Sequence, residues 1–334
     1  MRRKITQILA VLVMLVGFIL FLYPIAAKYL AGYKSSNIIK QFQKEIKKQT
    51  EEKEFKDNGE TGLNGLYSKL QTYNEQLYKS GQSGISNSLD YESVPFDLTQ
   101  YGFSQNVIST LWIPRMNVEL PVYLGANSDS LAKGAGLVGG TSMPVEGENT
   151  NVVLAGHRGY RGIPMFRDIQ LLQIGDKLSL TTPWETRIYR VKELKIIEPE
   201  DTNEVLIEPG EERLTLLTCH PYTKNYQRYM VVAEYAKGEK AVSYEEDLAE
   251  SKAAYNEQPK QVTLLKDGEE TEVLVESKSL IPVFYEENGE WGAGYSNIQI
   301  AMENYGVWIL FFMVCIIVVI VIRRSRSDKD KKSV

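Results

Sequence analysis

The segment "RLTLLTCHPYTKNYQRYMVVAEY", residues 213–235, decides the fold because it contains two β-type runs joined by a short polar connection. A hairpin centred near Thr223 and Lys224 would join "RLTLLTC" to "RYMVVAEY" and would place Cys219 opposite Arg228. Directly opposed residues of such a pair have Cβ atoms about 4.5–5.5 Å apart. The segment therefore predicts an antiparallel pair that brings a thiol close to a guanidinium.

Short runs of the same kind continue from Leu111 onward, with Gly, Pro, Asn and Asp between them and no long helical pattern. This texture predicts a mainly β fold, a closed barrel or a sandwich. The stretch "GAGLVG", Gly134 to Gly139, matches a dinucleotide-binding fingerprint, which requires a helix immediately afterwards. The following "GTSMPVEGENTN" cannot form that helix. We therefore read the glycines as turns, and we expect no cofactor and no metal.

Apolar residues at helical spacing predict amphipathic helices before the barrel. The first set falls between residues 38 and 46 and the second between residues 63 and 77. Towards the other end, "QVTLLKDGEETEVLVES" predicts a hairpin that turns at Asp267-Gly268. This hairpin belongs to an extension, residues 237–304, whose start is rich in Glu and Lys.

Two uncharged apolar stretches, Ile5–Ala27 and Tyr305–Ile322, approach the roughly 20 residues that a membrane-spanning helix needs. The first could also be a cleaved signal peptide, but it is long for one. Basic residues flank both stretches on their outer sides, which predicts that both termini are cytoplasmic. The net charge of -5 gives no sign of nucleic-acid binding.

These features divide the chain into six parts. They are a cytoplasmic start with the first span (1–27), membrane-proximal helices, a linker and a lid (28–96), a β-barrel (97–236), an extracellular extension (237–304), a second span (305–322) and a basic cytoplasmic tail (323–334).

The chain has two cysteines and two histidines, so thiol chemistry has few candidate residues. Cys315 lies in the second predicted span and is expected to be a buried apolar residue there. Cys219 is then the only external thiol, either a tolerated buried group or a reactive one.

Strand alternation selects the histidine that can serve Cys219. Successive side chains of a strand point to opposite faces, so the adjacent His220 faces away from Cys219. The remaining candidate is His157, which follows the apolar run "NVVLAG" and precedes a glycine-rich loop. Without Cys219, His157 would read as a surface-loop histidine.

Arg228 is the third candidate residue, after Cys219 and His157. A cation opposite Cys219 can lower the pKa of the thiol and can donate hydrogen bonds to an oxyanion. The alternative reading is a solvated charge between Tyr226 and Tyr229.

Residues 97–236 contain three motifs: "VVLAGHRGY", "LPVYLGANSDSLAKGAGLVGGTSMPVEGENT", and "TLLTC" with Arg228 nine residues after its cysteine. Through these motifs, residues 97–236 resemble the sortases of Gram-positive bacteria. The resemblance implies a closed β-barrel and transpeptidation at a C-terminal LPXTG-like sorting signal. It places the catalytic cysteine, histidine and arginine at Cys219, His157 and Arg228, and a substrate-binding residue at Thr218. The two spans and the long segment before the barrel are most similar to class C, the pilus-building sortases.

Class C sortases carry a lid of the form Asp-Pro-aromatic before the barrel, and the segment Val94, Pro95 and Phe96 occupies that place here. An Asp is missing from its first position, so the carboxylate of the lid is either absent or displaced to Asp97 or Asp90. The resemblance still implies that Phe96 covers the thiol.

The sequence therefore predicts a membrane-anchored cysteine transpeptidase whose extracellular domain acts on LPXTG-like proteins, with a pilin lysine as acceptor. A hydrolytic cysteine peptidase, a cell-wall-anchoring sortase of the housekeeping type and a non-enzymatic assembly scaffold remain alternatives.

Overall fold

The computed structural model describes residues 12, 14–19, 33–49, 62–82, 93–160, 163–222, 225–253, 260–266, 268–275, 284–287 and 290–293. The chain divides into two compact units, one of which is Gly32–Ser279. The other joins Met1–Ala31 to Leu280–Val334, and in it β11 (Phe284–Glu287) pairs with β12 (Glu290–Ala293).

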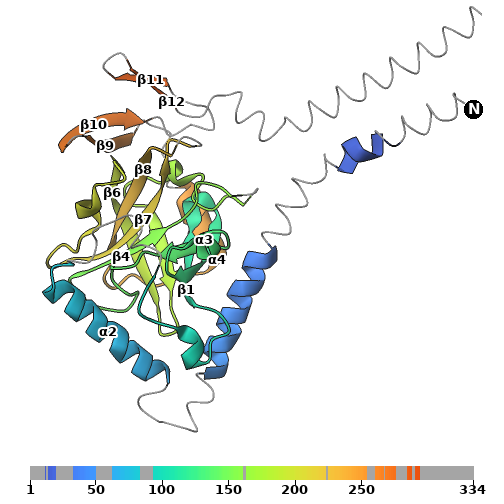
Figure 1. Cartoon of the computed structure of the whole chain (residues 1–334), viewed down its shortest axis with the longest axis vertical. Coiled ribbons are helices and arrows are strands. Elements are labelled where there is room, and N and C mark those ends of the chain that lie inside the picture. Colours follow the sequence, from blue (N-terminus) through green and yellow to red (C-terminus); the bar gives the residue numbers. More distant parts are fainter. Residues whose placement is uncertain are drawn as a thin grey trace, which may run out of the picture. The chain divides into compact units, whose positions relative to one another are not determined.

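The strands of the larger unit form one continuous sheet that closes on itself (Figure 1). The neighbours run β10-β9-β6-β5-β1-β2-β3-β4-β7-β8, and a further pairing of β6 with β8 closes the barrel. This confirms the predicted β-barrel. The strands are β1 (Val107–Ile113), β2 (Val118–Leu124), β3 (Ala135–Leu137), β4 (Thr150–Ala155), β5 (Lys177–Thr181), β6 (Thr186–Ile197), β7 (Glu212–His220), β8 (Gln227–Tyr235), β9 (Lys260–Lys266) and β10 (Glu269–Val275).

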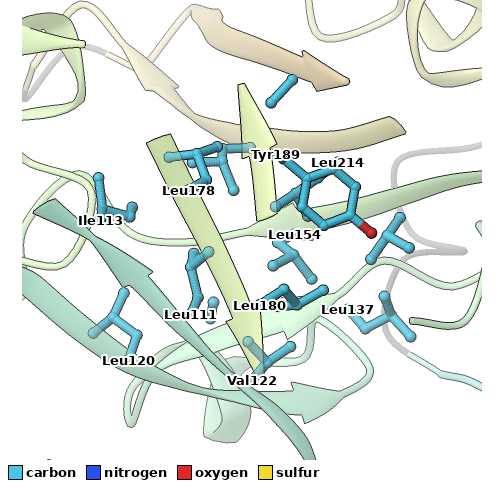
Figure 2. Close-up of a cluster of buried hydrophobic side chains, with 14 of the residues drawn as sticks. Leu111, Ile113, Leu120, Val122, Leu137, Leu154, Leu178, Leu180, Tyr189 and Leu214 are labelled. Carbon is cyan, nitrogen blue, oxygen red and sulfur yellow. The ribbon is translucent and has the colours of Figure 1, made fainter. Parts of the chain in front are cut away.

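Inward-facing apolar side chains fill the barrel (Figure 2). They include Leu111 of β1, Leu154 of β4 and Leu214 of β7, none of which is exposed to solvent. Burying one leucine contributes about 1.5–3 kcal/mol to folding. The barrel is therefore a packed core, and its function must be sought on its outer surface and at its ends.

The two helices predicted from apolar spacing between residues 38 and 77 are present before the barrel. Residues 33–49 are helical, and α2 (Leu63–Lys79) follows, with Leu66 and Leu70 fully buried. The side-chain amide of Asn74 donates to the carbonyl oxygen of Met143 and accepts from its N–H, at 3.0 and 2.7 Å. These bonds fix α2 against the barrel.

The contacts of α2 also show which end of the barrel it covers. The indole N–H of Trp184, in the turn between β5 and β6, donates to the carbonyl oxygen of Leu63 at 3.1 Å. Further along α2, Asn74 and Thr150, the first residue of β4, line the same hollow. Thr150 pairs with Glu212, the first residue of β7. Helix α2 therefore lies at the end where β4 and β7 begin.

The part of the extension that contains α4, β9 and β10 is attached to the barrel. Its helix α4 (Tyr244–Ala253) stacks Tyr244 on Trp112 of β1, with ring centroids 4.0 Å apart. The buried Lys177 amine contacts Asp247 of α4 at 2.7 Å. Although burial opposes it, the hydrogen bonds that Lys177 donates to the carboxylates of Asp247 and Glu250 raise the pKa of Lys177. Strands β9 and β10 then pair as an antiparallel hairpin, as predicted.

The membrane prediction lies largely outside the described residues. Within the residues that the structure does describe, no helix combines the length and the apolar character needed to cross a membrane. The second predicted span, 305–322, and most of the first belong to the remainder of the chain.

Candidate active site

Strands β7 and β8 pair in the predicted register. Cys219 lies directly opposite Arg228, and the adjacent pair is His220 with Gln227. The pairing follows from the turn, because one hairpin register fixes every opposed pair along both strands. The prediction that a thiol and a guanidinium share one rung of this hairpin is therefore confirmed.

His157 reaches the same place from β4, which runs parallel to β7. Ala155 pairs with Leu217, and the N–H of Gly156 donates to the carbonyl oxygen of Leu217 at 3.0 Å. Two residues further along each strand, this register brings His157 level with Cys219. The adjacent contact between Arg158 and His220, at 2.6 Å, shows that the alignment persists beyond the last strand pair.

The faces of the three strands separate the candidate residues from the barrel interior. Leu154 and Leu216 belong to the large core cluster, whereas Val153, Leu217 and Met230 belong to a second cluster on the other face. Because side chains alternate along a strand, His157, Cys219 and Arg228 lie on the face of this second cluster, away from the barrel interior.

The imidazole of His157 is half-buried against an aromatic ring. It stacks on Tyr160, with ring centroids 4.8 Å apart and an interplanar angle of 11°. Burial lowers the pKa of His157 below its usual 6.5. The ring is therefore mainly neutral near pH 7, and a neutral imidazole can accept a proton from a thiol.

Arg228 is held by the turn that precedes it. Its Nη1 donates to the carbonyl oxygens of Asn225 and Gln227, at 3.0 and 2.9 Å. These two bonds use one of its three guanidinium nitrogens. The two flanking tyrosines differ, since Tyr226 is 51% exposed and Tyr229 is buried within the barrel. Arg228 thus lies on the Cys219 side of the hairpin and is anchored there.

Thr218 is not placed as the expected substrate-binding residue. Its side chain is 3% exposed and points to the face opposite Cys219. Its hydroxyl donates to the carbonyl oxygen of Gly156 at 2.7 Å. In this structure the hydroxyl serves to tie β7 to β4, because strand alternation turns it inward.

The segment Val94, Pro95 and Phe96 packs against α2. The Phe96 ring meets the Tyr73 ring edge-on, with centroids 5.5 Å apart, and Val94 contacts the large core cluster. Helix α2 lies at the end of the barrel where β7 begins, and Glu212 and Cys219 are seven positions apart on that strand. At about 3.3 Å per residue, the separation is roughly 23 Å. The Phe96 ring therefore does not cover Cys219, in contrast to the lid expectation.

Of the two carboxylates considered for the lid, Asp97 and Asp90, the structure describes only Asp97. The side chain of Asp97 accepts hydrogen bonds from the N–H and the hydroxyl of Thr99, which lowers its pKa and caps a short 3-10 turn. Asp90 lies outside the described residues.

Sequence reasoning missed Arg158. Its side chain is 6% exposed and contacts His220 on the inner face of the barrel. The signal was available, because strand alternation puts Arg158 and His220 on one face just as it puts His157 and Cys219 on the other. This geometry also agrees with the prediction that His220 faces away from Cys219.

The arrangement has the elements of acyl transfer. It contains a thiol, a neutral imidazole two residues beyond the end of the neighbouring strand, and a guanidinium on the opposed position. These are a nucleophile, a proton acceptor and a group that can stabilise negative charge on oxygen.

Known proteins share this domain. Residues 111–236 match the sortase domain family model. Sortase D of Bacillus subtilis (strain 168) is 34% identical over 113 residues, which cover 34% of this chain and 54% of that protein. This chain thus spans little more than half of that relative. Sortase A of Listeria monocytogenes serovar 1/2a is 25% identical over 232 residues, or 70% of this chain and 92% of that protein.

Comparison of the structure with solved structures also finds proteins named as sortases. The structure matches the solved structure "Sortase C1 of GBS Pilus Island 1" with a TM-score of 0.51 and 26% identity, covering 63% of this chain and 100% of that one. The solved protein is named as a pilus sortase. Residues 111–236 are therefore similar to the sortase domain of these proteins.

Proposed function

We propose that this protein cleaves an LPXTG-like sorting signal and transfers the acyl group to an amine, with a pilin lysine as the acceptor. The observation that supports the proposal is the strand register, in which Cys219 is opposed to Arg228 and His157 follows two residues after the Ala155–Leu217 pair. The pilin acceptor is supported by the likeness to a pilus sortase.

In the proposed reaction, the neutral His157 accepts the thiol proton of Cys219 as the sulfur attacks the carbonyl carbon of the signal's threonine. Arg228 stabilises the negative charge that forms on the carbonyl oxygen. The C–N bond then breaks, and His157 gives its proton to the departing amine, which leaves a thioester on Cys219. An incoming lysine amine attacks the thioester, forms the new amide and releases the thiol.

The acceptor is tested by incubating the full-length protein with sorting-signal peptides, with and without an amine. The expected result is a new amide product that requires the amine and is absent with Cys219→Ala. Hydrolysed peptide alone would identify a peptidase and overturn the transfer step. Peptides left intact, together with slow thiol labelling at limiting reagent, would leave an assembly scaffold as the function.

We also propose that the stretches Ile5–Ala27 and Tyr305–Ile322 anchor the protein, with both termini inside the cell. The support is the apolar length of each stretch and the basic residues at their outer flanks. Protease added to intact protoplasts should leave a tag at either terminus undigested. Digestion of a C-terminal tag would overturn this topology.

A further inference from the structure

A buried cation lies directly behind the candidate catalytic residues. Nη1 of Arg158 donates to the carbonyl oxygen of Cys219 at 3.3 Å and to Nδ1 of His220 at 2.6 Å. Its Nη2 donates to the side-chain oxygen of Gln170. The side chain of Arg158, which follows β4, therefore binds the last two residues of β7.

The partner imidazole is neutral. A guanidinium can only donate, so Nδ1 of His220 must accept and its proton must lie on Nε2. Burial and the positive charge of Arg158 lower the pKa of His220 well below 6.5. Within the described part of the chain, no carboxylate forms an ion pair with Arg158, whose contacts there are a carbonyl, an amide, this neutral ring and the face of the Tyr229 ring, with its centroid 5.6 Å away.

Stability alone is a weak reason for this choice of residue. A buried charge without a countercharge is costly, and an apolar side chain of similar volume is often better tolerated. Two buried nitrogens of the cluster, Nε of Arg158 and Nε2 of His220, also have no hydrogen-bond partner among the described residues. The cation must therefore supply something that an apolar residue would not.

Arg158 connects the residues after β4 to β7 at the point where the main-chain pairing of these strands ends. Strand β4 stops at Ala155, and one further ladder bond runs from the N–H of Gly156 to the carbonyl oxygen of Leu217. His157 therefore follows the last paired position, and Gly159 soon turns the chain with a φ of +87°. Bonds from Arg158 to Cys219 and His220 continue the connection in place of main-chain pairing.

We propose that Arg158 is a positioning residue that holds His157 level with Cys219 by binding the Cys219 carbonyl and His220. This inference rests on the proposed pairing of His157 with Cys219 in the reaction. Arg158 itself lies on the inner face, so it acts through the backbone of β4 and β7 rather than by touching the reacting atoms.

A double-mutant cycle on the full-length protein tests this role, with the rate of Cys219 alkylation by iodoacetamide as the readout. This readout needs no sorting signal. Arg158→Gln should slow alkylation about tenfold in the presence of His157 and less than about twofold in a His157→Ala background, because contacting residues couple energetically. Arg158→Lys keeps the charge but lacks the planar fork, so it should behave like Arg158→Gln.

The matched control is Arg187→Gln. Arg187 is also buried, at 2% exposure, but it binds Glu212 at the opposite end of β7. It should lower the unfolding temperature and leave the alkylation rate of the folded protein unchanged. If Arg158→Gln fails to fold, His220→Leu and His220→Asn replace it. Leucine removes the acceptor and should slow alkylation, whereas the asparagine oxygen can replace Nδ1 and should restore most of the rate.

Three outcomes would contradict the role. An equal effect of Arg158→Gln with and without His157 would mean that the cation acts directly on the thiol, and no effect in either background would remove the role altogether. Both leave the proposed function intact, provided that His157→Ala still slows alkylation. A His157→Ala variant that alkylates at the wild-type rate would overturn the catalytic pair and this inference with it.

Discussion

The two ends of strand β7 are each held by a buried arginine, but the partners differ. At the first residue, Arg187 forms two hydrogen bonds to the Glu212 carboxylate, at 2.8 and 2.7 Å, and a third to Glu185. At the last residues, Arg158 binds a carbonyl and a neutral imidazole. The first arrangement balances its charge, and the second does not.

This difference indicates two different tasks. A bidentate arginine–carboxylate pair matches in charge and shape, so it suits an end whose function is to keep the barrel closed. An uncompensated cation is tolerated where it fixes the position of neighbouring groups. We expect substitutions at the Glu212 end to change stability and those at the Cys219 end to change reactivity.

The largest expected effect lies at the Cys219 end. Cys219→Ala should abolish acyl-enzyme formation, and His157→Ala and Arg228→Ala should lower turnover by about 10²–10⁴-fold and about 10²–10³-fold, as for other proton-transfer and oxyanion groups. Turnover of a sorting-signal peptide measures all three. His220→Ala should lose far less turnover than His157→Ala, because its ring faces the barrel interior and acts only through its contact with Arg158. A His220→Ala variant as inactive as His157→Ala would refute the face assignment.

The next effect lies at the Glu212 end. Arg187→Ala should destabilise the protein by about 3–5 kcal/mol, since it leaves a buried carboxylate without its partner. Chemical denaturation of the full-length protein measures this loss. Replacing Lys79, which forms an exposed ion pair with Glu75, should cost less than about 1 kcal/mol and serves as the control. A loss as small as that of the control would show that the Arg187–Glu212 pair does not stabilise this end.

A smaller effect concerns pH. The pKa of His220 is lower in the folded protein than in the unfolded chain, so the unfolded chain binds the proton more readily. Its contribution to stability should be complete above a pH of about 6.5 and should be lost as the pH falls below that value. Thermal unfolding over this range measures the loss. His220→Asn should reduce the dependence of the unfolding temperature on pH more than His157→Ala does. An equal pH dependence in both variants would contradict the difference in burial between the two histidines.

The smallest effect concerns Phe96. Since its ring packs on Tyr73 of α2, Phe96→Ala should lose the aromatic pair, worth about 0.5–1.5 kcal/mol, in addition to the partial burial of the ring. The alkylation rate of Cys219 should stay the same. A faster rate would mean that the segment does reach the thiol, and would restore the lid that the resemblance implies.

Local rules predicted much of this molecule. The hairpin register that opposes Cys219 and Arg228 depends only on the turn, and strand alternation alone separates His220 from Cys219. The scarcity of histidines then pointed to His157. Each of these inferences uses neighbours in sequence or one pair of strands.

Features set by tertiary packing could not be predicted in the same way. The location of Phe96 depends on where α2 docks, which is fixed by Asn74 and Met143, residues far apart in the sequence. The inward hydroxyl of Thr218 finds Gly156 only because β4 and β7 are parallel neighbours. The grip of Arg158 on β7 requires the same pairing.

The attachment of β9 and β10 to the barrel has a consequence for self-association. The pairing of β6 with β8 leaves the barrel strands between them with a neighbour on both sides. In the described sheet, however, β10 pairs only with β9 and has one open edge. An open edge can add a strand from another molecule. Here Glu269, Glu270 and Glu272 lie on that edge strand and are exposed. At neutral pH, two such edges repel one another, which disfavours self-association through this unpaired strand.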